Sequence, residues 1–109
     1  MADVLGAFEQ AVLLAIIRLD DEAYGRAIVK AVEERLERAV AVGAVHATLE
    51  RLARKRLVSS SLGPGTEVRA GRPRRYYAVT TAGRRALNDA RTALDQLWHG
   101  HEFPLRARR

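Results

Sequence analysis

The sequence predicts an α+β fold that is mainly α-helical, in a single domain of 109 residues. In four segments the apolar residues recur every three or four positions, which is the spacing of one buried helix face. Two shorter runs, residues 57–62 and 75–80, have β-like composition and are separated by a segment rich in glycine, proline and arginine. No internal repeat and no long linker divides the chain.

The first two predicted helices flank an acidic turn at residues 20–22. The first helix is expected to run from Asp3, a residue type suited to an N-cap, to Leu19. The second helix follows the turn, because carboxylates favour the positive end of a helix. Gly25 is expected inside this second helix at a cost of about 1 kcal/mol relative to Ala, which close approach by a neighbouring helix would offset.

The third predicted helix opens at Gly43, after a run at residues 39–42 that is typical of a minimal strand. Its apolar stripe consists of Val45, Leu49 and Leu52. At about 100° per residue the opposite face holds Gly43, Ala47, Glu50 and Arg54, with His46 and Arg51 on its flanks. The exposed side of this helix is therefore small at its start and basic near its end.

The two β-like runs are predicted to pair as a hairpin with a long arginine-rich tip, and a fourth helix follows them. Thr80 or Thr81 is suited to the N-cap of this helix, and Gly100 is expected to stop it. The expected units are a folded domain at residues 1–80, a last helix of the same compact unit at residues 81–100, and a flexible tail at residues 101–109.

Positive charge is concentrated in one part of the chain. The whole chain has 19 Lys and Arg against 13 Asp and Glu, which is a formal net charge of +6. Residues 51–85 hold ten basic side chains and one acidic side chain, whereas residues 1–50 hold five basic and nine acidic ones. Such a block attracts polyanions, of which nucleic acid is the commonest, and it favours nucleic-acid binding over a merely solvated surface.

Composition and motif content exclude several other classes. The chain has no cysteine, which removes thiolate nucleophiles, disulfides, zinc ribbons and iron–sulfur ligation. Its three histidines have no metal-binding spacing, and no catalytic or phosphate-binding motif is present. No apolar run approaches the roughly 20 residues of a membrane span. We therefore expect a cytoplasmic protein that is not an enzyme, needs no cofactor or metal, and does not bind a membrane.

Helices two and three, joined by a short connection, predict a helix-turn-helix, and the basic hairpin after them makes a winged helix-turn-helix with a two-stranded wing. Small residues at the start of helix three would let its backbone approach the major groove of DNA. Arginine in the wing suits bidentate contacts to phosphate. The predicted DNA-contacting residues are Gly43, Ala44, His46, Ala47, Arg51 and Arg54 in the helix and Arg72, Arg74 and Arg75 in the wing.

Three segments of the chain together carry a family resemblance. They are Leu5-Gly6-Ala7-Phe8-Glu9 through Leu19 with Ala23-Tyr24-Gly25, then Gly43-Ala44-Val45-His46-Ala47-Thr48-Leu49-Glu50-Arg51-Leu52, then Gly71-Arg72-Pro73-Arg74-Arg75-Tyr76-Tyr77-Ala78-Val79-Thr80 with Gly83. In this order they resemble the opening, the recognition helix and the wing strand of PadR-type transcriptional regulators. The resemblance implies a homodimeric winged-helix repressor with a single C-terminal dimerisation helix, as in the short branch of that family.

At one position of the recognition helix the sequence departs from the family pattern. PadR-type regulators usually have Tyr where this chain has His46, at the edge of the helix that faces DNA. Two interpretations stay open at this position. His46 either donates to a DNA phosphate, which would make binding depend on pH, or is merely tolerated at a helix edge.

The fourth helix has more apolar surface than one small domain needs, which supports a homodimer independently of the resemblance. The expected dimer-interface residues are Leu87, Ala90, Leu94, Leu97 and Trp98. In some PadR-type relatives aromatic residues at the dimer interface line a ligand cavity. The resemblance therefore also implies a small hydrophobic or aromatic effector, with Phe8 and Trp98 as its pocket residues. Plain interface packing of Trp98 is the competing interpretation.

The sequence thus predicts a sequence-specific regulator of transcription that binds double-stranded DNA. It is expected to be a repressor that acts as a homodimer on a pseudo-palindromic operator, with release by a small-molecule effector as an additional feature. Two other classes stay open. One is a winged-helix module whose basic face binds an acidic protein, and the other is a protein whose main activity is small-molecule binding. Retention on duplex DNA with a strong salt dependence would exclude the first, and fluorescence of Trp98 would report the second.

Overall fold

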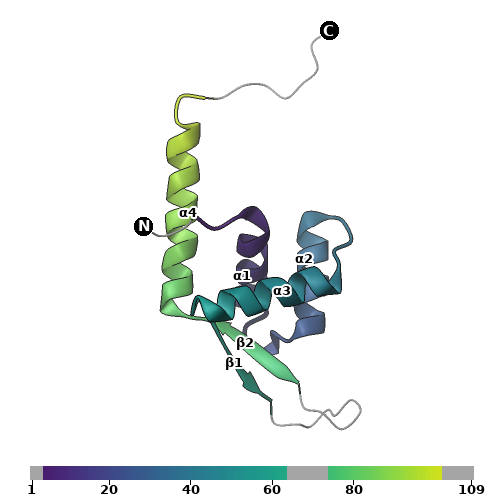
Figure 1. Ribbon diagram of the computed structural model, residues 1–109. Helices are drawn as coiled ribbons and strands as arrows, with labels where there is room; N and C mark the ends of the chain where they lie inside the picture. Colours follow the sequence, from purple (N-terminus) through teal and green to yellow (C-terminus); the bar gives the residue numbers. More distant parts are fainter. Residues whose placement is uncertain (1–3, 64–73, 102–109) are drawn as a thin grey trace.

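The computed structural model describes residues 4–63 and 74–101, and its elements follow the predicted order (Figure 1). They are α1 (Ala7–Leu19), the 3₁₀ helix η1 (Asp20–Glu22), α2 (Gly25–Leu36), α3 (Val42–Arg54), β1 (Val58–Leu62), β2 (Arg75–Val79) and α4 (Thr81–Trp98). The predicted fold class, mainly helical with a two-stranded antiparallel wing, is confirmed. Asp3, Arg72 and residues 102–109 of the expected tail lie outside the described residues.

The core is built around α1. Figure 1 shows α1 between α4 and α2, with α3 crossing in front and the hairpin below, and α1 packs against all three helices and β2. The largest fully buried side chains come from α1, α2 and α3, and they are Val12, Leu13, Ile16, Ile28, Val32, Val45, Leu49 and Leu52. The apolar stripe predicted for the third helix is therefore confirmed. Removal of these side chains from water is the main favourable term in folding.

The start of α1 differs from the prediction. The helix begins at Ala7 with Gly6 as its N-cap, so the expected N-cap at Asp3 is wrong. Leu5 lies before the helix and is buried in the core, and its carbonyl accepts a hydrogen bond from the side chain of Gln10 at 3.0 Å. Burial of Leu5 outside the helix explains the difference, because its apolar character continued the helical pattern without requiring a helical backbone.

Gly25 is the first residue of α2, not an interior residue, and Tyr24 is the N-cap. A Cβ atom at Gly25 would have no other heavy atom within 4 Å. The predicted close approach of a neighbouring helix is therefore wrong. The free-energy cost of glycine relative to alanine applies to the interior of a helix. At the first helical position this cost is smaller, so no compensating contact is needed.

Besides the hairpin, the structure has one β-bridge among the described residues, and it is not at the predicted position. Residues 39–41 connect α2 to α3 without strand structure, so the minimal strand expected at residues 39–42 is wrong. The amide of Val40 instead donates to the Glu33 carboxylate at 3.1 Å. The additional β-bridge joins Tyr24 to Tyr76, beside a backbone hydrogen bond from Tyr77 to Ala23 at 2.9 Å.

The hairpin is consequently fixed to the start of α2. In its antiparallel register Val58 lies opposite Val79, and Leu62 lies opposite Arg75. The rings of Tyr24 and Tyr76 also meet edge to face, with centroids 5.8 Å apart. These contacts hold β2 against the start of α2.

α4 stands at one side of the bundle, and its C-terminal half extends beyond the other elements (Figure 1). Its N-cap is Thr80, one of the two predicted residues, whose hydroxyl accepts from the Gly83 amide at 3.0 Å and donates to the Arg56 carbonyl at 2.8 Å. The helix ends at Trp98, and Gly100 follows with a φ of 78°. Within residues 4–63 and 74–101, none of the helices has both the length and the apolar character that a membrane crossing requires.

Candidate nucleic-acid interface

The predicted division of α3 into two faces is confirmed. Val45, Leu49 and Leu52 are buried, whereas the opposite side is open to solvent. The exposed residues of that side are Gly43, Ala44, His46, Ala47, Glu50, Arg51 and Arg54. A helix with one face in the core and the other unoccupied can be placed in a groove of DNA without unfolding any part of the domain.

The first turns of α3 have almost no side-chain bulk on the exposed face. A Cβ atom at Gly43 would meet nothing within 4 Å, and Ala44 and Ala47 add only methyl groups. The α3 backbone is therefore accessible there. Farther along the same face, the side chain of Arg54 forms no hydrogen bond or ion pair with any residue that the structure describes. Its guanidinium remains available to an external partner.

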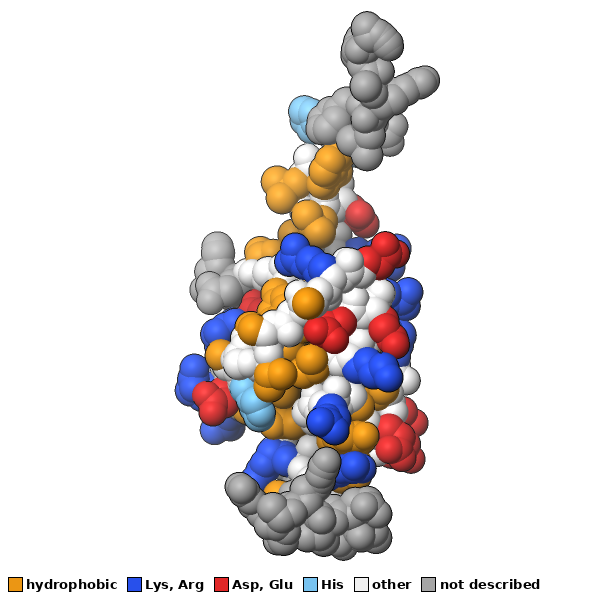
Figure 2. All heavy atoms as spheres, turned by 90° about the vertical axis from the view of Figure 1, so that its right-hand side faces the viewer, with side chains coloured by type: hydrophobic (Ala, Val, Ile, Leu, Met, Phe, Trp, Pro, Cys, Tyr) orange, Lys and Arg blue, Asp and Glu red, His pale blue; other side chains and the backbone are white. Residues whose placement is uncertain are grey.

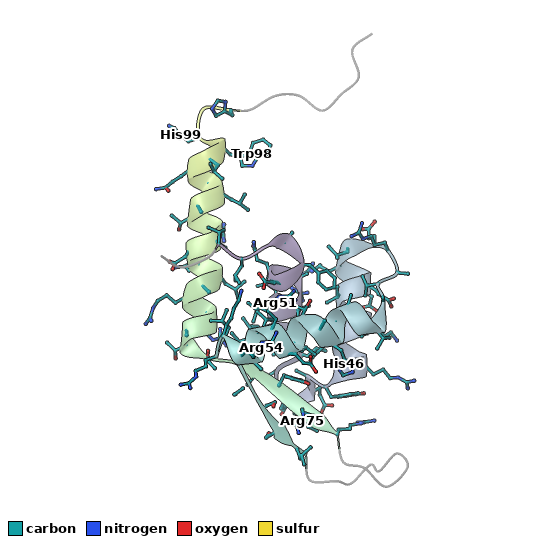
Figure 3. All side chains as sticks on the ribbon, viewed as in Figure 1. His46, Arg51, Arg54, Arg75, Trp98 and His99 are labelled. Carbon is teal, nitrogen blue, oxygen red and sulfur yellow. The ribbon has the colours of Figure 1, made fainter. Side chains whose placement is uncertain are left out.

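Arg51, which the sequence placed beside Arg54, is engaged within the protein. Its Nε donates to Oε2 of Glu9 in α1 at 3.3 Å, and its Nη2 donates to the hydroxyl of Thr48 at 3.3 Å. Lys55 donates to the same Oε2 of Glu9, also at 3.3 Å. In Figure 3 Arg51 lies on the α1 side of α3, whereas His46 and Arg54 lie nearer the hairpin.

Sequence reasoning did not identify Glu9, Thr48 or Lys55 as part of this site. The four-residue separation of Arg51 and Lys55 places both on one flank of α3, which was a usable signal. Nothing local indicated that Glu9, 42 residues before Arg51, faces this flank. Thr48 is buried on the core side of α3, where its hydroxyl has a partner in Arg51.

The cluster of Glu9, Arg51 and Lys55 also changes the titration of Glu9. Burial alone would raise the pKa of the Glu9 carboxyl. Hydrogen bonds from the Gly6 amide, Lys55 and Arg51 outweigh burial and lower the pKa below its ordinary value. The Gly6 bond, 3.1 Å long, reaches Oε1, so both carboxylate oxygens have donors.

We expect Glu9→Gln to destabilise the protein more at pH 6 than at pH 3. A pKa that is lower in the folded state contributes stability that is complete above the unfolded value, near 4.5, and is lost as pH falls through the folded value. The pH-dependent part should be about 0.5–1 kcal/mol, because water screens a cluster at the surface. Urea unfolding of both proteins at a series of pH values measures it. If the difference in unfolding free energy between the wild type and Glu9→Gln stays constant with pH, the lowered pKa of Glu9 is contradicted.

The wing contributes two described arginines next to α3. Arg75 donates from Nη1 to the Ser60 hydroxyl at 3.0 Å, and the Arg74 guanidinium lies 4.1 Å from the centre of the Tyr24 ring. Arg72, the third predicted wing residue, lies outside the described residues. Arg74 and Arg75 are thus oriented by contacts at the end of the strands that leads into the turn.

Tyr77 connects the wing electrostatically with α3. Burial raises the pKa of its phenol, Arg75 acts in the opposite direction, and Glu50 of α3 raises the pKa further. Glu50 and Arg75 are therefore both close enough to influence one phenol. α3 also packs against β1, which pairs with β2, so the helix and the hairpin adjoin each other.

His46 borders a hollow between α2 and α3. The hollow has a volume of about 740 Å³ and an apolar floor that includes Val29, Val45 and Leu49, with Arg26 and Lys30 among its lining residues. Figure 2 shows the side of the molecule that carries α2, where hydrophobic side chains lie among both basic and acidic ones. His46 itself is exposed. Its ring is thus accessible to solvent at the edge of the hollow.

Comparison with known proteins identifies the family of this chain. The model of the transcriptional regulator PadR-like family matches residues 13–89, from within α1 to within α4. The chain belongs to this family. PadR-like proteins are transcriptional regulators, which supports a DNA-binding role and the expectation that this chain is not an enzyme.

Solved structures of related proteins agree with this assignment. hsRosR-S1, determined in a complex, is 26% identical with a TM-score of 0.67, and the match covers 86% of this chain and 76% of that one. A PadR family regulator from Eggerthella lenta is 27% identical with a TM-score of 0.65, covering 82% of this chain and 75% of that one. A PadR-like regulator from Bacillus cereus, 20% identical over 87% of each chain, shares the fold with a TM-score of 0.69. No curated protein matches the sequence.

The predicted interface residues of this PadR-like regulator are not equally exposed on α4. Leu94, Leu97 and Trp98 are exposed by 45%, 73% and 53%, whereas Leu87 is half-buried and Ala90 lies in the chain's own core. Figure 2 shows hydrophobic side chains where α4 extends beyond the body. The apolar surface of α4 is therefore concentrated in its last two turns.

The two predicted effector-pocket residues lie in different surroundings in this PadR-like chain. Phe8 is half-buried and packs against the core, whereas Trp98 lies on the part of α4 that projects past α1 (Figure 3). Between α1 and α4 there is a hollow of about 320 Å³, to which Leu14, Ile17 and Leu94 contribute apolar side chains. Neither Phe8 nor Trp98 lines this hollow.

Proposed function

We propose that this PadR-like protein is a homodimeric repressor that binds a pseudo-palindromic operator in double-stranded DNA. The observation that carries the proposal is the exposed face of α3, whose helix packs against the hairpin that contains Arg75. Membership of the PadR-like family supports it independently. An acidic protein partner would bind the positive charge of this surface. It would not require small side chains on the exposed face of α3.

Each part of the surface has a separate task in this proposal. The small residues at the start of α3, Gly43, Ala44 and Ala47, allow the backbone to approach the floor of the major groove. Arg54 and Glu50 then reach base edges, since arginine pairs with guanine and a carboxylate accepts from cytosine.

The remaining predicted residues fix the position of the protein on the duplex. His46 at one flank of α3 donates to a phosphate, and Arg72, Arg74 and Arg75 bind the sugar-phosphate backbone beside the groove. Contacts of this kind supply most of the affinity and make it salt-dependent. Arg51, which is paired with Glu9, lies at the edge of this surface.

A second subunit is part of the proposal because one recognition helix reads too short a sequence for an operator. Two-fold symmetry through α4 would place two copies of α3 about one helical turn apart on the duplex. Leu94, Leu97 and Trp98 provide the apolar surface for this contact. A dimer of this size on a promoter would block access to it, which favours repression over activation.

Effector release is the remaining element of the proposal. A small hydrophobic or aromatic molecule would bind where Trp98 of one subunit approaches Phe8 of the other. Trp98 is the only tryptophan in the chain, so its fluorescence would report such a ligand directly. Binding there would alter the angle between subunits and thereby the spacing of the two α3 helices.

The experiment that tests the proposal is selection of bound sequences from a random duplex pool at two salt concentrations. We expect an enriched inverted repeat. On that operator Arg54→Gln should lower affinity by about tenfold to a hundredfold, the effect of losing one bidentate base contact. Arg35→Gln, at an exposed position in the last turn of α2, is the matched control and should leave affinity unchanged. Absence of retention on any duplex would favour a protein partner instead.

A further inference from the structure

Three cations lie along the second half of α3 and its end, but they are in different situations. Arg54 points away from the protein on the exposed face. Arg51 and Lys55 are both bonded to the Glu9 carboxylate of α1, at 3.3 Å each. Glu9 of α1 therefore forms ion pairs with two of the three cations that α3 and its C-terminal end would bring to DNA.

We propose that Glu9 is a positioning residue that weakens the contacts of α3 with DNA phosphates by holding Arg51 and Lys55 against α1. The inference rests on the proposed DNA binding and extends it to a residue outside the recognition helix. Glu9 acts through Arg51 and Lys55, so it is a positioning residue and does not itself contact DNA.

The geometry makes Glu9 an effective competitor for these cations. Its Oε1 is fixed by the Gly6 amide at the start of α1, so the carboxylate is held in one orientation with Oε2 toward α3. The Glu9 side chain is only 13% exposed, whereas those of Arg51 and Lys55 are 45% and 35% exposed. A phosphate that approached either cation would have to displace an acceptor that is already ordered.

The effect falls on phosphate contacts and leaves base contacts unchanged. Affinity for an arbitrary duplex comes almost entirely from neutralised phosphates, so each withheld cation weakens it directly. Affinity for an operator also includes base contacts by the exposed face of α3, which Glu9 does not touch. Holding two cations back therefore lowers the salt-dependent part of the affinity for any duplex, and base contacts become a larger share of operator affinity.

The test compares Glu9→Gln with Asp95→Asn, a variant with the same charge change at an exposed position on α4. Affinity of each dimeric protein for a random-sequence duplex is measured over a range of salt concentrations. For Glu9→Gln we expect the log–log salt slope to become steeper by about 1 to 2, with affinity higher by about threefold to tenfold near 0.1 M salt. Asp95→Asn should change neither. Equal slopes for the two variants would overturn the proposal.

A second pair of variants leaves Glu9 and its bond to Gly6 in place, so it remains informative if Glu9→Gln is too unstable to use. Lys55→Gln should hardly change the salt slope, because Lys55 is already neutralised by Glu9. Arg54→Gln should make the slope shallower by about 1. If both variants make the salt slope shallower by the same amount, Lys55 contacts DNA as freely as Arg54 does. That result would overturn the proposal that Glu9 restrains Lys55.

Failure of the proposed function can be separated from failure of this inference. If the wild-type protein does not bind duplex DNA, heparin replaces DNA as a polyanion without sequence. Elution of Glu9→Gln at a higher salt concentration than Asp95→Asn would still support release of two cations. Elution of both at the same salt concentration would overturn the role of Glu9.

Discussion

Replacing Leu97 by Asp is expected to raise the dissociation constant of the proposed dimer by at least about a hundredfold. Leu97 is 73% exposed in the single chain and lies between Leu94 and Trp98 on the projecting end of α4. A two-fold interface would contain the substitution twice, and each copy would bury an unpaired carboxylate. Sedimentation equilibrium on the variant and the wild type measures the change.

Two further results are expected for Leu97→Asp, one for the stability of the monomer and one for its affinity for operator DNA. Thermal unfolding of the Leu97→Asp monomer should resemble that of the isolated wild-type subunit, since Leu97 is not part of the core. Operator affinity should fall, because a monomer can occupy only one half-site. Leu36→Asp, on α2 and 38% exposed, is the matched control and should remain dimeric. A monomeric Leu97→Asp protein with full operator affinity would contradict the two-subunit arrangement.

Replacing Gly83 by Ala is expected to destabilise the fold by about 2–4 kcal/mol, although alanine normally favours a helix. A Cβ atom at Gly83 would collide with the Leu57 carbonyl oxygen, and it would lie 2.7 Å from Cγ1 of Val79. The first of these is a backbone atom, so it cannot move aside as a flexible side chain would. The start of α4 would have to move away from the hairpin. Urea unfolding monitored by circular dichroism gives the change in unfolding free energy.

Gly25→Ala is the control for this prediction, because it makes the same chemical change at a helix start without a collision. Nothing lies within 4 Å of a Cβ atom at Gly25, so the unfolding free energy should stay the same or increase by up to about 1 kcal/mol. Equal effects of the two substitutions would mean that α4 does not approach Leu57 as closely as the structure shows.

Much of the secondary structure could be predicted from local patterns. The spacing of Val45, Leu49 and Leu52 defined the buried face of α3. Thr80 was identified as a candidate cap because its hydroxyl can reach an amide three residues later, which is a contact within one turn. The two runs of β-like composition paired as expected, since a hairpin needs only neighbouring segments.

The errors occurred where the local pattern was ambiguous. Leu5 continued an apolar spacing but lies outside α1, and residues 39–42 had strand-like composition without a strand partner. The bridge at Tyr24 exists because β2 passes beside the start of α2. Strand pairing between distant segments is not encoded in the composition of either segment.

The fold class, the family and the division of α3 into a buried and an exposed face could all be predicted from the amino-acid sequence. These depend on periodicity and on motifs within short stretches, for which backbone geometry sets the spacing. Which cations of α3 are free depends instead on contacts between helices that are distant in the sequence. The contact of Glu9 with Arg51 and Lys55 arises where α1 crosses α3, and the crossing of two helices depends on the packing of the whole core.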